Sequence, residues 1–380
     1  MRTLICFGED WGRHPSTLQF LAKELAKRYR VLWIESLGVR RPRVCAADFR
    51  RALGKFRNWW QAHAKNEIEV PNLTVVAPLV LPFHGSAVAR GINRVIMNRV
   101  VCKALGQDDN QAPPLVVTAS PSSEYLLDQI ASERVVYYCA DEYSRMPGMD
   151  IDLIRKLEVR LLGKVDAVIV TSETLFKAKG VAGKPISLLR HGVDTTHFAA
   201  ATRPETPVAS VLQGIPEPIF GFYGLIQSHI DFQTIKIVAQ RRRDWSFVFI
   251  GPRDNDPAAF PSLPNIHYLP AQPYTQLPSV LKGFNVCLIP YEVDERTRDR
   301  NPVKLREYLS GGKPVISTPL PEVLVYRDVV AIASTADEFE CAGERLLQEQ
   351  GREWAHRRME RVRDDNWDAV AHRFVEVLEG

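Results

Sequence analysis

The 380-residue sequence lacks any run of about 18 apolar residues, the length that a membrane-spanning helix requires. It also lacks the pattern of a signal peptide, because the opening MRTLICFGED reaches Glu9 and Asp10 after one short apolar stretch. No low-complexity segment interrupts a composition that is 45% hydrophobic and 25% charged. We therefore expect a folded cytoplasmic protein in which any membrane contact is peripheral.

Cysteine is scarce and scattered, with six residues, no CxxC pair and no histidine at the spacing of a zinc site. We interpret these cysteines as reduced structural thiols. Asp254 and Asp256 stand in a DND triplet, which we interpret as a solvated turn, so no metal and no cofactor are expected. The sequence has no zinc finger, RNP motif or helix-turn-helix spacing, and nucleic acid is not an expected partner.

The net charge of +4 is unevenly distributed. Residues 1–200 carry 28 Lys and Arg against 20 Asp and Glu, a balance of +8, whereas the remainder carries 21 against 25, a balance of −4. An excess of positive charge in one half favours an anionic partner there, such as a phospholipid surface or a lipid-linked pyrophosphate.

Short apolar runs alternate with amphipathic segments along the chain, which is typical of parallel sheets covered by helices. Strands are expected at 3–7, 31–35, 115–118, 135–138, 167–171 and 187–189, and again at 219–223, 246–250, 266–268, 286–289 and 315–317. Between them, residues 199–217 lose periodicity and gain proline, as a linker does. We expect an α/β protein with one Rossmann-like domain at 1–200, a second at 201–363, and a terminal helix at 364–380.

The segment NPVKLREYLSGGKPVIST, residues 301–318, has a helix that begins near Pro302 and ends at a Gly-Gly pair. It resembles the donor-binding segment of GT-B nucleotide-sugar glycosyltransferases of the family 4 or group 1 kind, which include bacterial polysaccharide-assembly enzymes. Three further blocks resemble the same family in order and spacing: LLRHGVDTTHF at 188–198, IFGFYGLIQSHIDFQTI at 219–235, and LPAQPYTQLPSVLKGFNVCLIPYE at 269–292. The resemblance implies two Rossmann-like domains facing each other across a cleft, with the terminal helix packed back on the first domain.

The resemblance also assigns donor-binding residues in the second domain. Glu307 corresponds to the carboxylate that binds the ribose hydroxyls, Lys304 lies one turn earlier to meet the diphosphate, and Gly224 lets backbone amides approach the phosphates. Further contacts with the nucleotide sugar are expected from Arg253, Tyr291, Asp299 and Pro302. The chain departs from the family where Asp299 replaces a common glutamate and where Gln227, Ser228 and His229 replace a basic pair.

An inverting transfer needs a base for the acceptor hydroxyl. Asp141 and Glu142 follow the strand at 135–138, so we expect both at the carboxyl end of that strand, facing the ligand crevice of the sheet. Asp141 is the preferred base, because it resembles the aspartate found after this strand in bacterial membrane-associated inverting members of the GT-B fold. The alternative is that Asp141 caps a segment or pairs with Arg145.

Other groups of the first domain are weaker candidates for the same crevice. Asp10 is an alternative base, and Glu9, His14 and His191 are expected near the acceptor. Acids in a loop before a helix are more often helix caps than bases, and His191 is equally interpretable as a histidine held by backbone groups.

Residues 40–65 hold eight Lys and Arg against the single acid Asp48, with aromatic residues at helical spacing. This pattern indicates either a helix that lies on an anionic membrane or an ordinary helix with a basic outer face.

Taken with the resemblance, these features predict a metal-independent glycosyltransferase. It moves a sugar from a nucleoside diphosphate to a glycan or a polyprenyl-pyrophosphate-linked acceptor. Two alternatives stay open, a nucleotide-sugar 2-epimerase and a nucleotide-sugar binding or scaffold protein without transfer activity.

Overall fold

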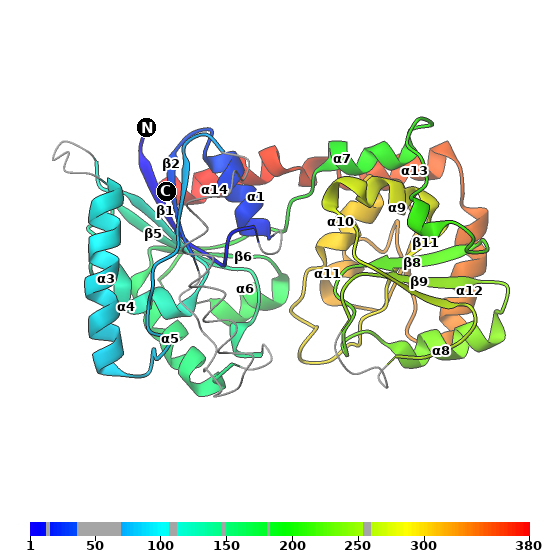
Figure 1. The fold of residues 1–380 in the computed structure, drawn as a ribbon, viewed down its shortest axis with the longest axis horizontal. Helices are drawn as coiled ribbons and strands as arrows, with labels where there is room; N and C mark the ends of the chain where they lie inside the picture. Colours follow the sequence, from blue (N-terminus) through cyan, green and yellow to red (C-terminus); the bar gives the residue numbers. More distant parts are fainter. Residues whose placement is uncertain (13–15, 36–69, 106–111, 146–148, 181–182, 254–259) are drawn as a thin grey trace. The chain divides into compact units, whose positions relative to one another are not determined.

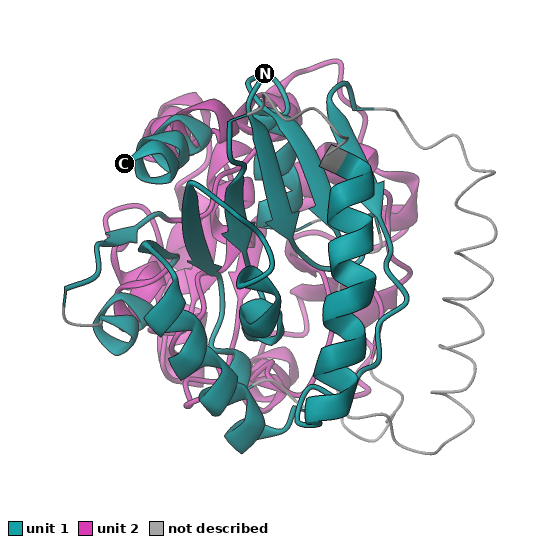
Figure 2. Cartoon of the chain, turned by 90° about the vertical axis from the view of Figure 1, so that its left-hand side faces the viewer, with its two compact units in different colours: residues 1–171, 175–189, 370–380 teal, residues 172–174, 190–369 magenta. Residues whose placement is uncertain are grey.

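The structure is a computed structural model, and it describes residues 1–12, 16–35, 70–105, 112–145, 149–180, 183–253 and 260–380 (Figure 1). The chain forms two compact units, coloured separately in Figure 2. Unit 1 comprises residues 1–171, 175–189 and 370–380, and unit 2 comprises residues 172–174 and 190–369. The main change from unit 1 to unit 2 is at residue 190. The sequence alone predicts a domain boundary at residue 200.

Unit 1 is built on a seven-stranded sheet in which all neighbouring strands are parallel. In sheet order the strands are β3 (Leu73–Val76), β2 (Arg30–Ile34), β1 (Thr3–Phe7), β4 (Leu115–Thr118), β5 (Arg134–Cys139), β6 (Ala167–Val170) and β7 (Ile186–Leu188). The helices are α1 (Thr17–Leu25), α3 (Ala87–Leu105), α4 (Glu124–Leu127), α5 (Ile151–Lys164) and α6 (Glu173–Lys179). The strand order reverses between β1 and β4, so the loops after these strands flank the edge at which such sheets bind ligands.

Unit 2 repeats this plan with six parallel strands. In sheet order they are β10 (Ile266–Leu269), β9 (Ser246–Ile250), β8 (Ile219–Tyr223), β11 (Val286–Ile289), β12 (Val315–Ser317) and β13 (Ala331–Ile332). The helices are α7 (Thr195–Ala199), α8 (Phe232–Arg241), α9 (Leu277–Gly283), α10 (Val303–Ser310), α11 (Pro321–Leu324), α12 (Ala336–Gln348) and α13 (Arg352–Glu360). Here the order reverses between β8 and β11.

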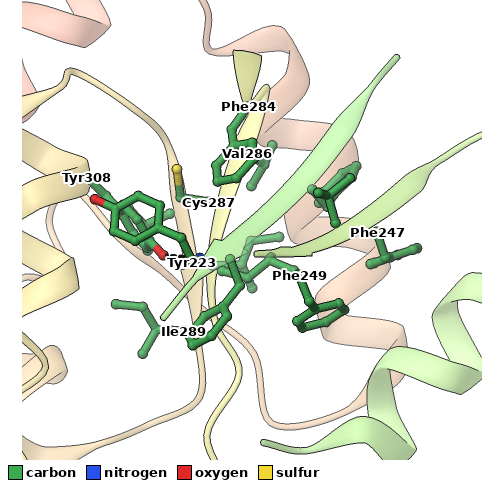
Figure 3. Packing of buried hydrophobic residues seen from close by; sticks show 14 of the residues in the cluster. Tyr223, Phe247, Phe249, Phe284, Val286, Cys287, Ile289 and Tyr308 are labelled. Carbon is green, nitrogen blue, oxygen red and sulfur yellow. Dashed lines mark hydrogen bonds between the residues drawn. The ribbon is translucent and has the colours of Figure 1, made fainter. Parts of the chain in front are cut away.

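Aromatic side chains dominate the core of unit 2. Phe220 stacks on Trp245 with ring centroids 4.2 Å apart, and Phe249 stacks on Tyr268 at 5.7 Å. Figure 3 shows part of this packing, where side chains of β8, β9 and β11 meet around Tyr223. Because these strands are buried on both faces, they read as continuous apolar runs in the sequence.

The last helix, α14 (Trp367–Glu379), begins in unit 2, and its residues from 370 onward belong to unit 1. There Phe374 lies against Tyr138, with ring centroids 5.9 Å apart, and the carboxylate of Glu379 pairs with Arg28 at 2.7 Å. The apolar stripe of this helix is therefore a packing surface within unit 1, where its terminus lies close to α1 (Figure 1).

Candidate active site

The glycine turn after β8 is built around contacts that no larger residue allows. Gly224 has a φ of +133°, and a Cβ atom placed there would lie 2.3 Å from Cε of Lys304. Gly251, after β9, has a φ of +148°, and its Cβ would lie 1.9 Å from the carbonyl oxygen of Gly224. The two glycines let the loops after β8 and β9 meet and let the Lys304 ammonium lie over the turn.

Helix α10 carries Lys304 and Glu307 to the same edge of the sheet. Its N-cap is Pro302, whose side chain makes no capping hydrogen bond, and the N–H of Leu305 donates to the Pro302 carbonyl at 3.1 Å. Burial raises the pKa of Glu307, while the Lys304 ammonium and the Tyr223 hydroxyl counter that rise. The backbone N–H of Tyr223 donates to the Tyr308 hydroxyl at 3.3 Å, which ties the helix to β8.

Positive charge gathers beside this turn around a buried histidine. The His229 ring packs edge-on against Tyr291, with centroids 4.7 Å apart. Burial lowers the pKa of His229 to about 4, and the charges of Arg300 and Lys304 act in the same direction, so this imidazole is neutral at pH 7. Sequence reasoning gave no role to Arg300, because only the folded loop brings it close to His229.

The other residues predicted to bind the nucleotide sugar differ in their contacts. Arg253 follows β9, and its guanidinium lies 5.0 Å from the ring centroid of Tyr268. Asp299, Pro302 and Tyr291 are buried, and the Tyr291 carbonyl accepts a hydrogen bond from Thr318 Oγ1 at 2.6 Å. The helix after the glycine turn, α8, is capped by its own Asp231, whose carboxylate accepts from the N–H of Thr234 at 2.9 Å.

In unit 1, Asp141 follows β5 at the carboxyl edge of the sheet. Burial raises the pKa of the neighbouring Tyr138, and the negative charges of Asp141 and Glu9 raise it further. The loops after β1 and β5 therefore bring two carboxylates to one tyrosine.

Glu142, by contrast, belongs to a buried ion-pair network. Its carboxylate lies 2.7 Å from Lys179 Nζ, which also contacts Glu158 at 2.6 Å, and Tyr137 donates to Glu158 at 2.8 Å. Burial alone raises the pKa of Glu142, but hydrogen bonds from Lys179 and Ser144 outweigh it, and the pKa falls below its ordinary value. A carboxylate held in this way is a weak base.

The acids of the first loop contact the start of α1. Glu9 accepts hydrogen bonds from Ser16 Oγ and from Gln19 Nε2, the latter at 3.1 Å. The carbonyl of Asp10 faces the same Gln19 amide at 3.4 Å. The N-cap of α1 is Ser16, whose hydroxyl accepts from the N–H of Gln19 at 3.3 Å, so Glu9 contacts the cap residue and does not itself cap the helix. His14 lies outside the described residues.

His191 lies in unit 2 and is 7% exposed. Burial lowers its pKa to about 3, and the charge of Arg306 adds to this effect. The imidazole is therefore neutral and a poor proton acceptor at pH 7.

Sequence reasoning missed a cluster of hydroxyl groups after β4. Thr118 and Ser123 are joined at 2.7 Å, and Ser120 and Ser122 at 2.8 Å. The signal was present as the run ASPSSE directly after a buried strand. The position of β4 beside β1 places these hydroxyls at the point where the strand order reverses.

Within the described part of the chain, no group of three or more His, Cys, Asp or Glu is placed to hold a metal ion. The DND triplet and residues 40–65 lie outside that part. None of the described helices is long and apolar enough to span a bilayer.

Comparisons with known proteins extend these observations. No protein-family model matches the chain. A candidate glycosyltransferase of teichuronic acid biosynthesis from Bacillus subtilis (strain 168), TuaH, is 28% identical over 274 residues. That match spans 66% of this chain and 66% of the relative, just under two thirds of its length.

Solved structures match over almost the whole chain. The sucrose-phosphate synthase of Thermosynechococcus elongatus has a TM-score of 0.69 at 15% identity, covering 100% of this chain and 98% of that one. The E. coli trehalose-6-phosphate structure bound with UDP-2-fluoro glucose has a TM-score of 0.68 at 11% identity, covering 99% of each chain. The chain has the GT-B fold. The predicted fold class, two parallel-sheet Rossmann-like domains of the kind seen in GT-B glycosyltransferases, is thereby confirmed.

Proposed function

We propose that this GT-B chain is a glycosyltransferase that uses a nucleoside diphosphate sugar and acts in bacterial polysaccharide or glycolipid assembly. The observation that carries the proposal is the Gly224, Lys304 and Glu307 arrangement at the carboxyl edge of unit 2. The name of the Bacillus relative, which refers to teichuronic acid biosynthesis, supports a glycan acceptor.

The donor is assigned to unit 2. The ammonium of Lys304 and the charge of Arg300 would stabilise the negative charge that grows on the leaving diphosphate. The carboxylate of Glu307 would accept hydrogen bonds from the two ribose hydroxyls. Neither task requires a metal ion, because the protein itself supplies the positive charge.

The acceptor is assigned to unit 1, with Asp141 as the base. The acceptor oxygen forms a bond to the anomeric carbon, the bond from that carbon to the diphosphate oxygen breaks, and the hydroxyl proton moves to the Asp141 carboxylate. Asp141 is preferred over Glu142 because the latter is committed to Lys179. An acceptor on a polyprenyl pyrophosphate, with residues 40–65 on a cytoplasmic membrane face, completes the proposal.

The test is a thermal-shift and turnover measurement with UDP, dTDP, GDP and ADP and their sugar conjugates. A ligand that binds only the folded state raises the melting temperature, so one nucleoside diphosphate should stand out. Glu307→Gln should reduce that affinity by about 10- to 100-fold, because a hydrogen bond to a charged group is worth about 1.5–3 kcal/mol. The exposed Glu205 supplies the matched control, Glu205→Gln, which should bind like the unmodified protein.

Other outcomes separate the alternatives. Absence of a shift with all four nucleotides would contradict donor binding. Binding without transfer would favour a binding or scaffold protein, and conversion of the donor sugar without an acceptor would favour an epimerase.

A further inference from the structure

A cavity of about 230 Å³ lies in unit 2, away from the candidate donor site. It is lined by the segment leading into β13, the end of α12, and α13, which contribute Arg327, Asp328, Arg345, Glu349, Trp354, Arg357 and Arg358. All strands of unit 2 are parallel, and the cavity is at their amino ends, whereas Gly224 follows the carboxyl end of β8. The cavity and the donor candidates therefore occupy opposite edges of one sheet.

Positive charge exceeds negative charge in this cavity. Four arginines line it against two acids, a balance of +2. Glu349 is shared, because its carboxylate lies 2.7 Å from Arg345 and 3.5 Å from Arg358. The carboxylate of Asp328 pairs at 3.3 Å with Arg361, which is not a lining residue. Among the described residues, the exposed Arg327 has no side-chain hydrogen bond or ion pair.

Arg358 forms the buried part of the wall and is incompletely neutralised. Its side chain is 3% exposed, and its contacts are long: 3.4 Å to the Gly312 carbonyl, 3.2 Å to the Glu349 carbonyl and 3.5 Å to the Glu349 carboxylate. Charge-assisted hydrogen bonds are normally about 2.7–2.9 Å long. Burial lowers the pKa of Arg358, as expected for a charge removed from water without a close counter-ion.

Trp354 contacts two of the three arginines of α13. The guanidinium carbons of Arg357 and Arg358 lie 5.7 and 5.8 Å from the centre of its indole ring. Cation–π contacts of this kind orient guanidinium groups without using their N–H donors. Arg357 makes one hydrogen bond, to the Asp328 carbonyl at 3.0 Å, and Arg358 makes the three long ones given above. The other N–H groups of the two side chains can donate to oxygen atoms of a ligand.

We propose that this cavity binds the phosphate group of a small phosphorylated metabolite, at a site separate from the nucleotide site. Several arginine forks converging from different directions fit the oxygens of a phosphate monoester. The volume is below the roughly 300–1,000 Å³ of sites for drug-sized ligands, so the ligand is small. The inference goes beyond the proposed donor function and does not depend on it.

The test is isothermal titration of the full chain with inorganic phosphate, glucose 6-phosphate and glucose. We expect both phosphates to bind and glucose not to bind. Arg327→Gln and Arg357→Gln, two exposed positions, should each weaken phosphate binding by about tenfold or more, whereas Arg352→Gln, an exposed arginine of α13 outside the cavity, should not. Affinity for the preferred nucleoside diphosphate should stay unchanged in all three variants.

A comparison of the affinities for glucose 6-phosphate and inorganic phosphate shows which kind of phosphate ligand the cavity recognises. Tighter binding of glucose 6-phosphate than of inorganic phosphate would support a sugar phosphate, and equal binding would support recognition of the phosphate alone. Absence of binding by both, binding unaffected by the Arg327 and Arg357 changes, or binding only to vesicles that contain phosphatidic acid would overturn the proposal. Loss of nucleotide binding with phosphate binding intact would count against the donor function alone.

Discussion

The carboxyl edges of the two sheets use their charged side chains differently. In unit 2, two glycines with positive φ let the Lys304 ammonium lie over the turn after β8, and the charges of Lys304 and Arg300 help to lower the pKa of His229. In unit 1, Glu9 contacts the start of α1, and Glu142 is bound to Lys179. The comparison teaches that a cluster of acids at a sheet edge is not by itself a catalytic set, since most of these acids have structural partners. Asp141 is the acid that we assign to chemistry.

The largest expected effect tests the assignment of Asp141 as the base. Asp141→Asn should lower kcat for sugar transfer by about 10²- to 10⁴-fold, the usual contribution of a general base, and should leave nucleoside diphosphate affinity unchanged. The measurement is steady-state kinetics beside nucleotide titration. Asp152→Asn, an exposed acid at the start of α5, is the control. Normal turnover by the Asp141 variant would move the base to Asp10 or Glu142.

The second effect concerns stability in unit 1. Lys179→Met leaves the carboxylates of Glu142 and Glu158 buried without a cation and should lower the free energy of unfolding by about 3–5 kcal/mol at pH 7. Urea unfolding measures it, with the exposed Lys177→Met on the same helix as control.

The pH dependence of this network has a definite sign. The pKa of Glu142 is lowered in the folded state, so its contribution to stability is present above its ordinary value of 4.5 and is lost as the pH falls through the folded pKa. In Lys179→Met the two buried carboxylates repel each other, so protonation relieves the repulsion and acid partly restores stability. The deficit should shrink as the pH is lowered below about 5. A deficit that is independent of pH would show that the network is not electrostatic in origin.

The smallest effect tests the close approach of Lys304 to Gly224 in unit 2. Gly224→Ala and Gly214→Ala both place an alanine at positive φ, and both should lower stability by about 1 kcal/mol. Only Gly224→Ala displaces Lys304, since nothing lies within 4 Å of a Cβ at Gly214. Nucleotide affinity should therefore fall by about tenfold in the first variant alone. If calorimetry gave the two variants the same nucleotide affinity, Lys304 would not be a ligand of the diphosphate.

Much of the fold could be predicted because the buried strands are continuous apolar runs. β1, β4, β8, β9, β11 and β12 have the bounds expected from the sequence. The long helix α3 was not expected, because its residues do not separate by face: Val88, Ile92 and Val95 are exposed, whereas Asn93 is buried. The edge strand β3 was not expected because it is only partly buried.

The candidate site could be predicted only in part. Lys304 and Glu307 are three residues apart on one helix, so their proximity follows from helical spacing. The pairing of Lys179 with Glu142 joins positions 37 residues apart, and the approach of Arg300 to His229 joins positions 71 apart. Contacts of this kind depend on how the loops after different strands fold, which no local pattern specifies.

The path of α14 has a consequence for synthesis on the ribosome. Residues 370–380 complete unit 1, yet they are made after the whole of unit 2. Until then the surface of Tyr138 that Phe374 covers has no partner from this helix. Domains tend to fold as units in the order in which they emerge, so unit 2 can finish folding while unit 1 still waits for its last helix. During that interval unit 1 lacks the packing surface that α14 supplies.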